Sequence, residues 1–303
     1  MWTTQNMPDL TGKTVLVTGA NTGIGYETAL AFYRAGAHVV LACRSLDNAR
    51  QAQAAMQEQP GRAGTLAVAQ LDLASLRQVH QFADAFRQQY PQLHVLVNNA
   101  GVLAPPLAST TAEGYELQFG VNFLGHFALT GHLYFLLNHT PGARVVTVTS
   151  MGYLDGRLDF ANLQSENGYD ALREYRQSKL ANLLFALELQ RRIRAIHGRV
   201  QSLAAQPGAN RTSWVKDISP EYLAAAEARW GGPAMEPWQG ALTSLYAAVA
   251  AEAAGGKLYS PDQNGGFRGY PAEASIAPHA LNEPVAQALW QLAEQATGLV
   301  FPT

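Results

Sequence analysis

Cysteine, charge and long apolar runs are all scarce in this sequence. The single cysteine, Cys43, excludes an internal disulfide and a cysteine-based metal cluster, and its place in the run HVVLAC indicates a buried small side chain. Charged residues make up 15% of the chain and the formal net charge is -2, so no basic stripe marks a nucleic-acid surface. No window approaches the ~18 uninterrupted apolar residues that span a membrane. We therefore expect neither a nucleic-acid partner nor a membrane span.

The first ten residues lack the basic start and apolar core of a secretory signal, so the expected location is the cytoplasm. Apolar residues make up 48% of the 303 residues, which suffices for a sizeable core. Neither a repeat nor a long linker divides the chain. We expect one domain over residues 1–303, with a cofactor-binding part over 10–150 and substrate loops over 151–170 and 207–240.

A glycine-rich turn joins the first expected strand to the first expected helix. The β-branched run at 13–18 ends in Gly19, and Gly23 and Gly25 follow before a helix that Gly36 closes. Glycines allow a tight turn and a close approach of the backbone to a pyrophosphate, whose charge the free N–H groups of the helix start can meet. An ordinary strand-to-helix turn is the alternative, but three glycines favour a dinucleotide site.

The second expected strand, at 37–42, is followed by Cys43 and Arg44. An NAD enzyme usually places an acid here for the ribose hydroxyls. A guanidinium instead suits the 2′-phosphate of NADP, so we predict a preference for NADP(H) over NAD(H). Asp47 lies three residues on, and Arg44 could also merely cap a surface loop.

Strands and helices alternate through much of the chain. Helices are expected over 47–58, 75–90 and 237–253, and further strands at 65–73, 93–101, 143–150, 199–208 and 256–260. This alternation predicts an α/β fold, a Rossmann-type doubly wound parallel sheet of about seven strands with helices on both faces. Ligands of such sheets collect at the carboxyl ends of the strands.

Polar residues follow several of these strands. Asp72 either accepts a hydrogen bond from an adenine amino group or caps the next helix. The fourth strand ends in two asparagines, and the side chain of Asn98 can bond the backbone or a cofactor ribose. After the sixth strand, Thr212 can bond the amide or a phosphate of the cofactor.

Residues 112–138 predict one long helix whose apolar face Asn122 interrupts. A buried asparagine needs partners, either in a water network or in a neighbouring group. His126, His132 and His139 lie six and seven residues apart rather than the four of a helical metal pair. We expect solvated or core histidines and no metal site.

A helix within residues 170–190 places Tyr175 and Lys179 one turn apart on one face. Free tyrosine has a pKa of ~10, too high for acid–base work at neutral pH, and a nearby ammonium lowers it. The pair alone is weak, because the same spacing occurs by chance in amphipathic helices. Ser150, at the end of the fifth strand, adds a hydroxyl opposite this helix, although a serine there can be a simple turn former.

Taken in order, TGANTGIG, NNAG, Asn122, Ser150, Tyr175-x-x-x-Lys179 and PG-x-x-x-T resemble the short-chain dehydrogenase/reductase family nearly end to end. More narrowly, NFLGHFALT, YRQSKLANLLFALEL and LWQLAEQATG resemble its retinol-dehydrogenase and protochlorophyllide-reductase-like branch. The resemblance implies that Tyr175 is the general acid/base and that Lys179 lowers its pKa and holds the nicotinamide ribose. It also implies that Ser150 polarises the substrate oxygen and that Asn122 supports a proton-relay water.

The resemblance further implies the cofactor contacts. The three turn glycines would face the pyrophosphate, Arg44 the 2′-phosphate and Asp72 the adenine. Asn98 would lie at the adenosine-side strand end or at the ribose, and Thr212 near the nicotinamide amide. The full expected set is Gly19, Asn21, Thr22, Gly23, Ile24, Gly25, Arg44, Asp72, Leu73, Asn98, Ala100, Gly101, Lys179, Pro207, Gly208 and Thr212. Gln206 departs from this branch, which often has histidine there, and this difference concerns the cofactor-side wall rather than the catalytic residues.

The expected activity is the NADP(H)-dependent interconversion of a carbonyl and an alcohol. Two alternatives stay open. One is reduction of a carbon–carbon double bond with the same tyrosine and lysine. The other is a non-catalytic nucleotide sensor on the same fold, although such proteins commonly lose the tyrosine or the lysine, and here both are present.

Large apolar residues follow Thr212. Three interpretations of this segment stay open: a lid over the ligand, a helical core segment, or a subunit contact of a homo-oligomer. They are Trp214, Ile218, Tyr222, Trp230, Met235 and Trp238. Together with Leu103, Pro105, Tyr153 and Leu154 they favour a bulky, mainly apolar ketone, aldehyde or alcohol as the substrate.

Replacing Arg44 by alanine tests the cofactor preference. We expect Arg44→Ala to weaken NADPH binding by roughly 10- to 100-fold, because a charge-assisted contact to a phosphate is lost, and to leave NADH binding unchanged. Fluorescence titration of both cofactors measures this. Equal use of NADH and NADPH by the wild-type protein would contradict the assignment.

Overall fold

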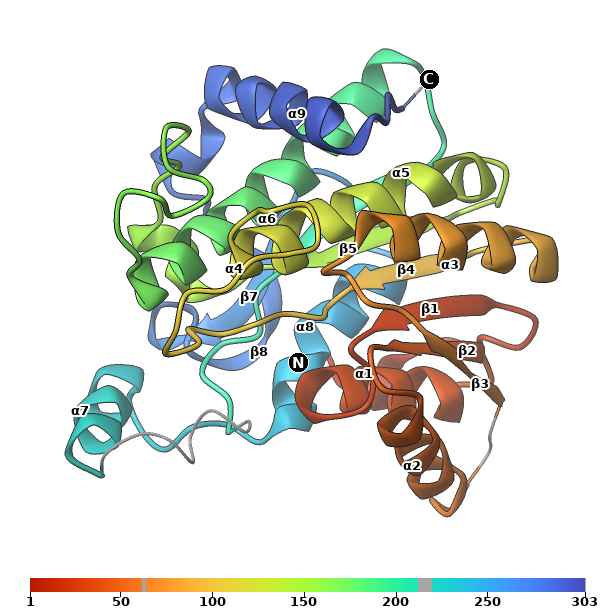
Figure 1. The fold of residues 1–303 in the computed structure, drawn as a ribbon. Coiled ribbons are helices and arrows are strands. Elements are labelled where there is room, and N and C mark those ends of the chain that lie inside the picture. The colour runs from red at the N-terminus through yellow and green to blue at the C-terminus, as the bar shows by residue number, and fades with distance from the viewer. Residues whose placement is uncertain (62–63, 212–219, 303) are drawn as a thin grey trace.

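The computed structural model describes residues 1–61, 64–211 and 220–302. Its centre is an eight-stranded sheet with the order β3-β2-β1-β4-β5-β6-β7-β8, in which β1 to β7 run parallel and β8 pairs antiparallel with β7 (Figure 1). The strands are β1 (Thr14–Thr18), β2 (His38–Cys43), β3 (Thr65–Gln70), β4 (Val95–Asn98), β5 (Arg144–Val148), β6 (Gln201–Ala205), β7 (Leu258–Gln263) and β8 (Arg268–Ala274). The predicted doubly wound α/β fold is confirmed.

Helices cover both faces of the sheet. They are α1 (Gly23–Arg34), α2 (Leu46–Gln57), α3 (Leu76–Gln89), α4 (Leu117–Phe119), α5 (Gly125–Asn138), α6 (Ala171–Ala195), α7 (Pro220–Trp230), α8 (Pro237–Val249) and α9 (Glu283–Thr297). A π-helical turn spans Gly120–Leu124, and short 3₁₀ turns span Thr4–Asn6, Met151–Asp155, Asn264–Gly266 and Pro278–Leu281.

Alternate residues of the central strands pack into two separate cores, as a sheet covered on both faces requires. Val15 and Val17 of β1 pack with α1, α2 and α8, whereas Leu16 packs with α3, α5 and α6. Figure 1 shows these two layers below and above the sheet, with α9 as an outer layer over α5 and α6. The strand order reverses between β1 and β4, and sheets of this kind bind their ligands at the carboxyl ends of the strands beside such a reversal.

The predicted single helix over 112–138 is wrong at its start. Residues Thr110 and Glu116 instead form an isolated antiparallel bridge, and Gly114 between them has a φ of 87° that a helix cannot contain. The helical segment begins at Leu117 and passes through the π turn before α5. Asn122 therefore lies on a π turn, a feature often found at functional sites.

Two C-terminal elements were not predicted. β8 forms a hairpin with β7, and α9 follows the helix that we expected to be the last. The signal for α9 is nevertheless present, because Asn282 caps it and Ala286, Leu289, Trp290 and Ala293 form its buried stripe. The predicted end of α8 is also four residues too long, since α8 stops at Val249.

The helix α9 is held on α5 and α6 by an aromatic cluster. The Trp290 ring lies 4.9 Å from Phe127, 5.8 Å from Phe185 and 5.0 Å from Phe301, measured between ring centroids. Trp290 is fully buried and its Nε1 donates to Glu294 Oε1 at 2.9 Å. This cluster seals the apolar face that α5 and α6 turn away from the sheet.

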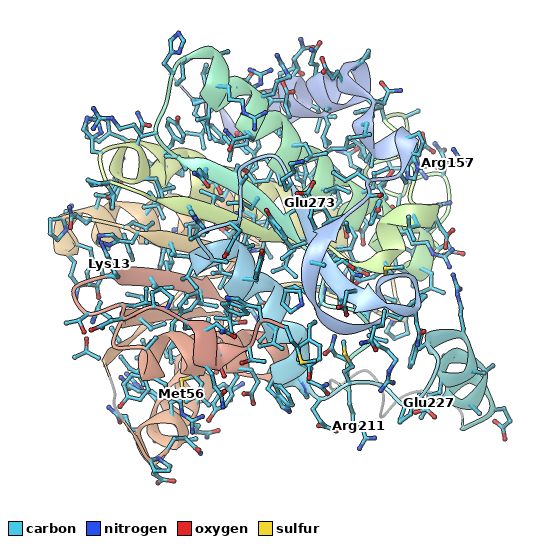
Figure 2. All side chains as sticks on the ribbon, turned by 180° about the vertical axis from the view of Figure 1, so that it is seen from behind. Lys13, Met56, Arg157, Arg211, Glu227 and Glu273 are labelled. Carbon is cyan, nitrogen blue, oxygen red and sulfur yellow. The ribbon has the colours of Figure 1, made fainter. Side chains whose placement is uncertain are left out.

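Other parts of the surface are stabilised by exposed charges. In the view from behind, Glu273 lies on β8, where it accepts from Lys257 Nζ at 2.6 Å, and Glu227 lies on α7 at the edge of the molecule (Figure 2). Such exposed ion pairs contribute about 0–1 kcal/mol each. The buried cluster around Trp290 is therefore the stronger target for a stability test.

We expect Trp290→Ala to lower the free energy of unfolding by ~3–5 kcal/mol, because it empties a fully buried indole site. Urea denaturation followed by far-UV circular dichroism measures the change. The matched control is Trp238→Ala, whose side chain is 47% exposed and which should have a much smaller effect. Equal losses in the two variants would contradict the larger contribution assigned to the buried Trp290 ring.

Candidate functional site

The glycine turn after β1 has the geometry that only glycine can adopt. Gly19 has a φ of 66°, and a Cβ there would lie 2.9 Å from the Cα of Ala100, which follows β4. A Cβ on Gly25 would lie 2.3 Å from the Gly19 carbonyl oxygen. Both positions therefore need glycine, since any side chain would force the β1 and β4 ends apart.

The N-terminus of α1 is not capped by a side chain. Thr22 occupies the N-cap position without a capping hydrogen bond, and the first turn contains no acidic residue. In contrast, Ser45 caps α2 and Ser75 caps α3. The first N–H groups of α1 are thus available to an external acceptor, and with the glycine turn they fit the pyrophosphate of a dinucleotide.

Arg44 lies at the carboxyl end of β2 with an exposed side chain. Its carbonyl accepts from Gln70 Nε2 at 3.2 Å, but its guanidinium makes no hydrogen bond or ion pair with any of residues 1–61, 64–211 and 220–302. Asp47 pairs with Arg50 at 3.4 Å rather than with Arg44. The Arg44 guanidinium is therefore free to take an anionic group.

The adenine side differs in part from the prediction. Asp72 Oδ1 accepts from the N–H of Ala74 at 2.9 Å, and the helix cap of α3 is Ser75, so Asp72 does not cap that helix. Leu73 is buried beneath α5. The contact of either residue with adenine stays a prediction.

Asn98 faces the interior. It is buried at the end of β4 and its Nδ2 donates to Thr130 Oγ1 at 3.0 Å. The next residue, Asn99, lies at the glycine turn instead, because its Nδ2 donates to the Thr18 carbonyl at 2.8 Å and a Cβ on Gly25 would lie 2.5 Å from that Nδ2. The asparagine that contacts the glycine turn is therefore Asn99, and the contact of Asn98 with the adenosine side or the ribose stays a prediction.

Lys179 is a buried ammonium with few partners. Its side chain extends from α6 across the end of β5, and its Nζ donates to the Val148 carbonyl at 3.3 Å. Burial lowers the pKa of this ammonium from 10.5 to about 8. Among the residues that the structure describes, this long hydrogen bond is the only one that Nζ donates, so its other N–H groups have capacity for hydroxyl acceptors of a ligand. Gly101 borders the ammonium, because a Cβ there would lie 3.5 Å from Nζ.

Tyr175 lies beside Ser150 and near Lys179, so the structure brings together the three residues predicted to share a site. Burial raises the pKa of the Tyr175 hydroxyl, and a hydrogen bond with Ser150 opposes this rise without cancelling it. The direction is opposite to the lowering predicted from the Lys179 charge. The Lys179 Nζ lies 5.8 Å from the centre of the Tyr175 ring, and its charge is not among the causes of the Tyr175 pKa shift, which burial dominates.

Ser150 follows β5 and begins a 3₁₀ turn, with its Oγ accepting from the N–H of Gly152 at 3.0 Å. A Cβ on Gly152 would lie 3.4 Å from Tyr175 Cε1 and 3.5 Å from Ser150 Oγ. These are ordinary van der Waals distances, so the turn packs against the tyrosine ring without requiring glycine at this position. Nothing in the sequence pattern pointed to this glycine.

Asn122 is fully hydrogen-bonded. Its Oδ1 accepts from the N–H of Val102 at 2.7 Å, and its Nδ2 donates to the Val102 carbonyl at 3.0 Å and to Ser178 Oγ at 2.9 Å. The side chain thus fastens the loop after β4 to α6, one residue before Lys179. Its predicted support of a proton-relay water stays a prediction.

The segment after β6 is held by Gln206. The buried Nε2 donates to Ser260 Oγ at 2.9 Å and to the Gly266 carbonyl at 2.6 Å, while Oε1 accepts from the N–H of Gly208. Gln206 therefore fixes Pro207 and Gly208 against β7. Thr212, Trp214 and Ile218 lie outside the described residues, so their predicted roles stay predictions.

Only some of the apolar residues predicted to contact the substrate lie where a ligand could reach them. Leu103 and Leu154 are exposed near the ends of β4 and β5, but Tyr153 is buried and packs against His279. Trp230 packs with Ala209 and Ala234, and Met235 is buried. Tyr153 therefore belongs to the core rather than to a ligand surface, because its ring is enclosed by the segment before α9.

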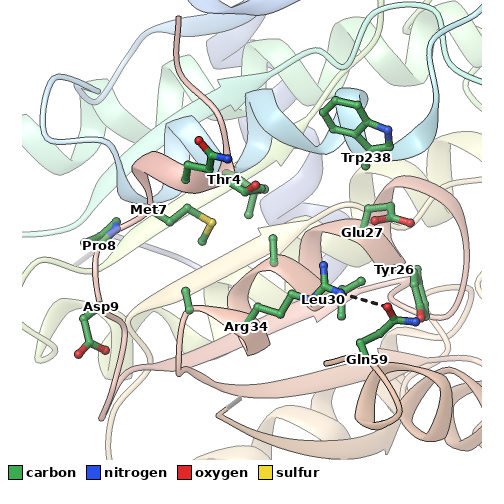
Figure 3. Close-up of a pocket in the computed structure, with 14 residues that line it drawn as sticks. Thr4, Met7, Pro8, Asp9, Tyr26, Glu27, Leu30, Arg34, Gln59 and Trp238 are labelled. Carbon is green, nitrogen blue, oxygen red and sulfur yellow. Dashed lines mark hydrogen bonds between the residues drawn. The ribbon is translucent and has the colours of Figure 1, made fainter. Parts of the chain in front are cut away.

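Trp238 lies at another place, in a cavity of about 720 Å³ between the N-terminal segment, α1 and α8 (Figure 3). Met7, Tyr26, Glu27 and Arg34 also line it. None of the predicted catalytic residues is among its lining residues, so this cavity and the Tyr175 site are separate.

Two further properties concern metals and membranes. Among the residues that the structure describes, no three His, Cys, Asp or Glu side chains are grouped to hold a metal ion. Within the same described part of the chain, no helix combines the length and the apolarity needed to cross a membrane.

Comparisons with known proteins show which family this chain resembles. A family model described as short chain dehydrogenase matches residues 13–223. Retinol dehydrogenase 14 of Mus musculus is 38% identical over 95% of this chain and 87% of its own length. The WW domain-containing oxidoreductase of Pongo abelii is 41% identical over 95% of this chain and 68% of its own length. The crystal structure of a putative uncharacterized protein from Mycobacterium Paratuberculosis matches with a TM-score of 0.82 and 36% identity over 100% of this chain and 99% of that one.

The buried ammonium of Lys179 makes stability depend on pH. Its folded pKa of about 8 is below the unfolded value of 10.5, so between these pH values the unfolded chain binds a proton that the folded protein lacks, and stability rises with pH. At pH 7 the buried charge costs roughly 3 kcal/mol or less. Lys179→Met should therefore be more stable than the wild type at pH 7, and this advantage should shrink by about pH 9.5.

Urea denaturation at both pH values measures the difference. Lys257→Met is the control, because a hydrogen bond with Glu273 raises the pKa of that exposed lysine and its removal should bring no gain at pH 7. A pH-independent difference between Lys179→Met and the wild type would contradict the lowered pKa of Lys179.

Proposed function

Because the chain belongs to the short-chain dehydrogenase family, we propose that it interconverts a carbonyl and an alcohol with NADP(H) as the cofactor. The observation that carries this proposal is the convergence of Tyr175, Ser150 and Lys179 beside the uncapped glycine turn. One edge of the sheet then carries three groups: the Tyr175 hydroxyl as an acid, the Ser150 hydroxyl that can bind the substrate oxygen, and the Lys179 ammonium that can bind the cofactor.

In the reduction direction, the Tyr175 hydroxyl donates its proton to the substrate oxygen as negative charge develops there. The raised pKa of Tyr175 keeps this proton in place at neutral pH. Ser150 hydrogen-bonds the same oxygen and steadies its charge. The bound nicotinamide would supply the hydride to the carbonyl carbon.

Lys179 binds and orients rather than transfers the proton itself. Its ammonium is enclosed between Gly101 and the end of β5, so it reaches hydroxyl groups of a bound ribose without direct access to bulk water. A charge at that place also favours the deprotonated form of Tyr175 once the proton has left. The lysine therefore supports both cofactor binding and the oxidation direction.

NADP(H) is favoured over NAD(H) by the Arg44 side chain. Its guanidinium is exposed at the carboxyl end of β2 and is not neutralised by Asp47, which pairs with Arg50. A planar guanidinium can bind two phosphate oxygens at once.

A bulky apolar substrate is favoured by two observations. Leu103 and Leu154 expose apolar side chains after β4 and β5, the strands that end on either side of the site. In addition, the relatives that are 36–39% identical over most of the chain are named retinol dehydrogenases, and retinol is a long apolar alcohol.

Two alternative functions would use the same site, and experiments can separate them from carbonyl reduction. Reduction of a carbon–carbon double bond would give a saturated ketone from an enone, whereas carbonyl reduction gives an allylic alcohol, so product analysis separates the two. A nucleotide sensor would bind NADPH tightly without turnover on a broad panel of carbonyls. The intact Tyr175 and Lys179 favour catalysis over sensing.

Replacing Tyr175 by phenylalanine tests the catalytic role. Tyr175→Phe removes the proton donor and keeps the ring, so we expect kcat to fall by roughly 10²- to 10⁴-fold. The dissociation constant of NADPH should change by less than about threefold, because the hydroxyl acts mainly in the transition state. Steady-state kinetics on an apolar ketone and fluorescence titration of NADPH measure the two effects.

Tyr90→Phe serves as the control, since Tyr90 is a half-buried tyrosine that terminates α3 away from the site. It should retain wild-type kcat. Near-normal turnover by Tyr175→Phe would exclude this tyrosine as the acid.

A further inference from the structure

His126 is a buried histidine beside the proposed site. It is the second residue of α5, is 1% exposed, and directly follows the π turn that carries Asn122. Its Nδ1 lies 2.9 Å from the Asn122 carbonyl oxygen, and its Nε2 lies 2.8 Å from Thr18 Oγ1. The imidazole thus bridges β1 and the π turn.

The partners of the ring determine its tautomer. A carbonyl oxygen only accepts, so Nδ1 must carry the proton that is donated to Asn122. A neutral ring then has an acceptor at Nε2, which takes the proton of the Thr18 hydroxyl. Burial lowers the pKa of this imidazole to about 4, and the charge of Lys179 acts in the same direction.

The Thr18 hydroxyl has no spare acceptor for a protonated ring. Its oxygen already accepts from the N–H groups of Asn99 and Ala100, at 2.9 Å each. The hydroxyl proton can go to His126 Nε2 at 2.8 Å or to the Val97 carbonyl oxygen at 3.3 Å, and neither choice frees an accepting position on the Thr18 oxygen. A second proton on His126 would require Thr18 to accept a third N–H, so the network holds the ring neutral.

This network joins the two halves of the proposed site. Thr18 directly precedes Gly19 and binds the loop after β4, so it holds the glycine turn and Ala100 together. On the other side, the Asn122 side chain fastens Val102 to Ser178, next to Lys179. His126 is the hydrogen-bonded link between them.

We propose that His126 is a positioning residue, which as a neutral Nδ1–H imidazole holds the Asn122 π turn against Thr18 and thereby sets the place of Lys179 relative to the glycine turn. This inference rests on the proposed function, because the geometry matters through turnover at Tyr175. His126 does not touch substrate or cofactor in this role.

Variants of His126 test the link through turnover. His126→Phe keeps a ring of similar shape and removes both hydrogen bonds, so we expect kcat to fall by roughly 10- to 100-fold as the site shifts. His126→Asn keeps an N–H donor at the position of Nδ1, so it should recover most of this loss. Because Lys179 and the glycine turn are the proposed cofactor contacts, NADPH binding should also weaken in His126→Phe and recover in His126→Asn.

The chain offers a matched control on the same helix. His139 Nδ1 also donates to the carbonyl four residues earlier, that of Phe135, at 2.8 Å, but its side chain is exposed. His139→Phe removes this local contact alone and should leave kcat unchanged. Equal losses in His126→Phe and His139→Phe, or equal losses in His126→Phe and His126→Asn, would overturn the positioning role.

The ring state provides a readout that does not depend on activity. Nitrogen-15 NMR of the eight histidines should show one ring that stays a neutral Nδ1–H tautomer between pH 5 and pH 9, assigned to His126 by its absence in His126→Phe. A His126 that titrates near pH ~6.5 would overturn the proposed network. If the wild type instead lacks all turnover while this signal is present, the proposed function fails and the network stands.

Discussion

Two parallel strands cannot be joined by a short hairpin, because the chain must return to the same end of the sheet before it pairs. Each connection from β1 to β7 therefore crosses one face, and the carboxyl ends of adjacent strands meet at one edge. The strands β1, β4, β5 and β6 are neighbours in the sheet, and the residues that follow them are, in the same order, Gly19, Ala100, Ser150 and Gln206. The site is assembled by this constraint from residues that are far apart in the chain.

Desolvation controls the charge of the groups at this edge. It raises the pKa of Tyr175 and lowers the pKa values of Lys179 and His126, so each group moves toward its neutral form. The tyrosine consequently holds its proton and the histidine stays uncharged. Lys179, with a pKa of about 8, is the remaining cation among them at neutral pH.

The polar groups at this edge fall into two kinds. Asn122 and the Thr18 hydroxyl have their hydrogen-bonding capacity filled by the protein, which suits a rigid frame. Lys179 and the first turn of α1 are left with unused donors. A preorganised binding site is expected to combine these two kinds of group: polar residues fixed by hydrogen bonds within the protein, and neighbouring donors that are available to a ligand.

Much of the fold and the core of the site followed from the sequence. Apolar runs of four to eight residues between glycine and polar segments predicted all seven parallel strands, because burial on both faces requires such runs. The spacing of Tyr175 and Lys179 likewise fixed their common helical face, since that is a local property of a helix.

Tertiary contacts decided what local patterns do not contain. The start of α4 depends on a bridge between Thr110 and Glu116, and the place of Asn98 depends on Thr130 across the core. The sign of the Tyr175 pKa shift also required the structure, because the ammonium four residues away was evident from spacing, whereas the burial that raises the pKa was not. The sequence by itself determined which groups can meet on one strand edge or helix face. The tertiary structure alone decided how much water surrounds them, and with it their charge.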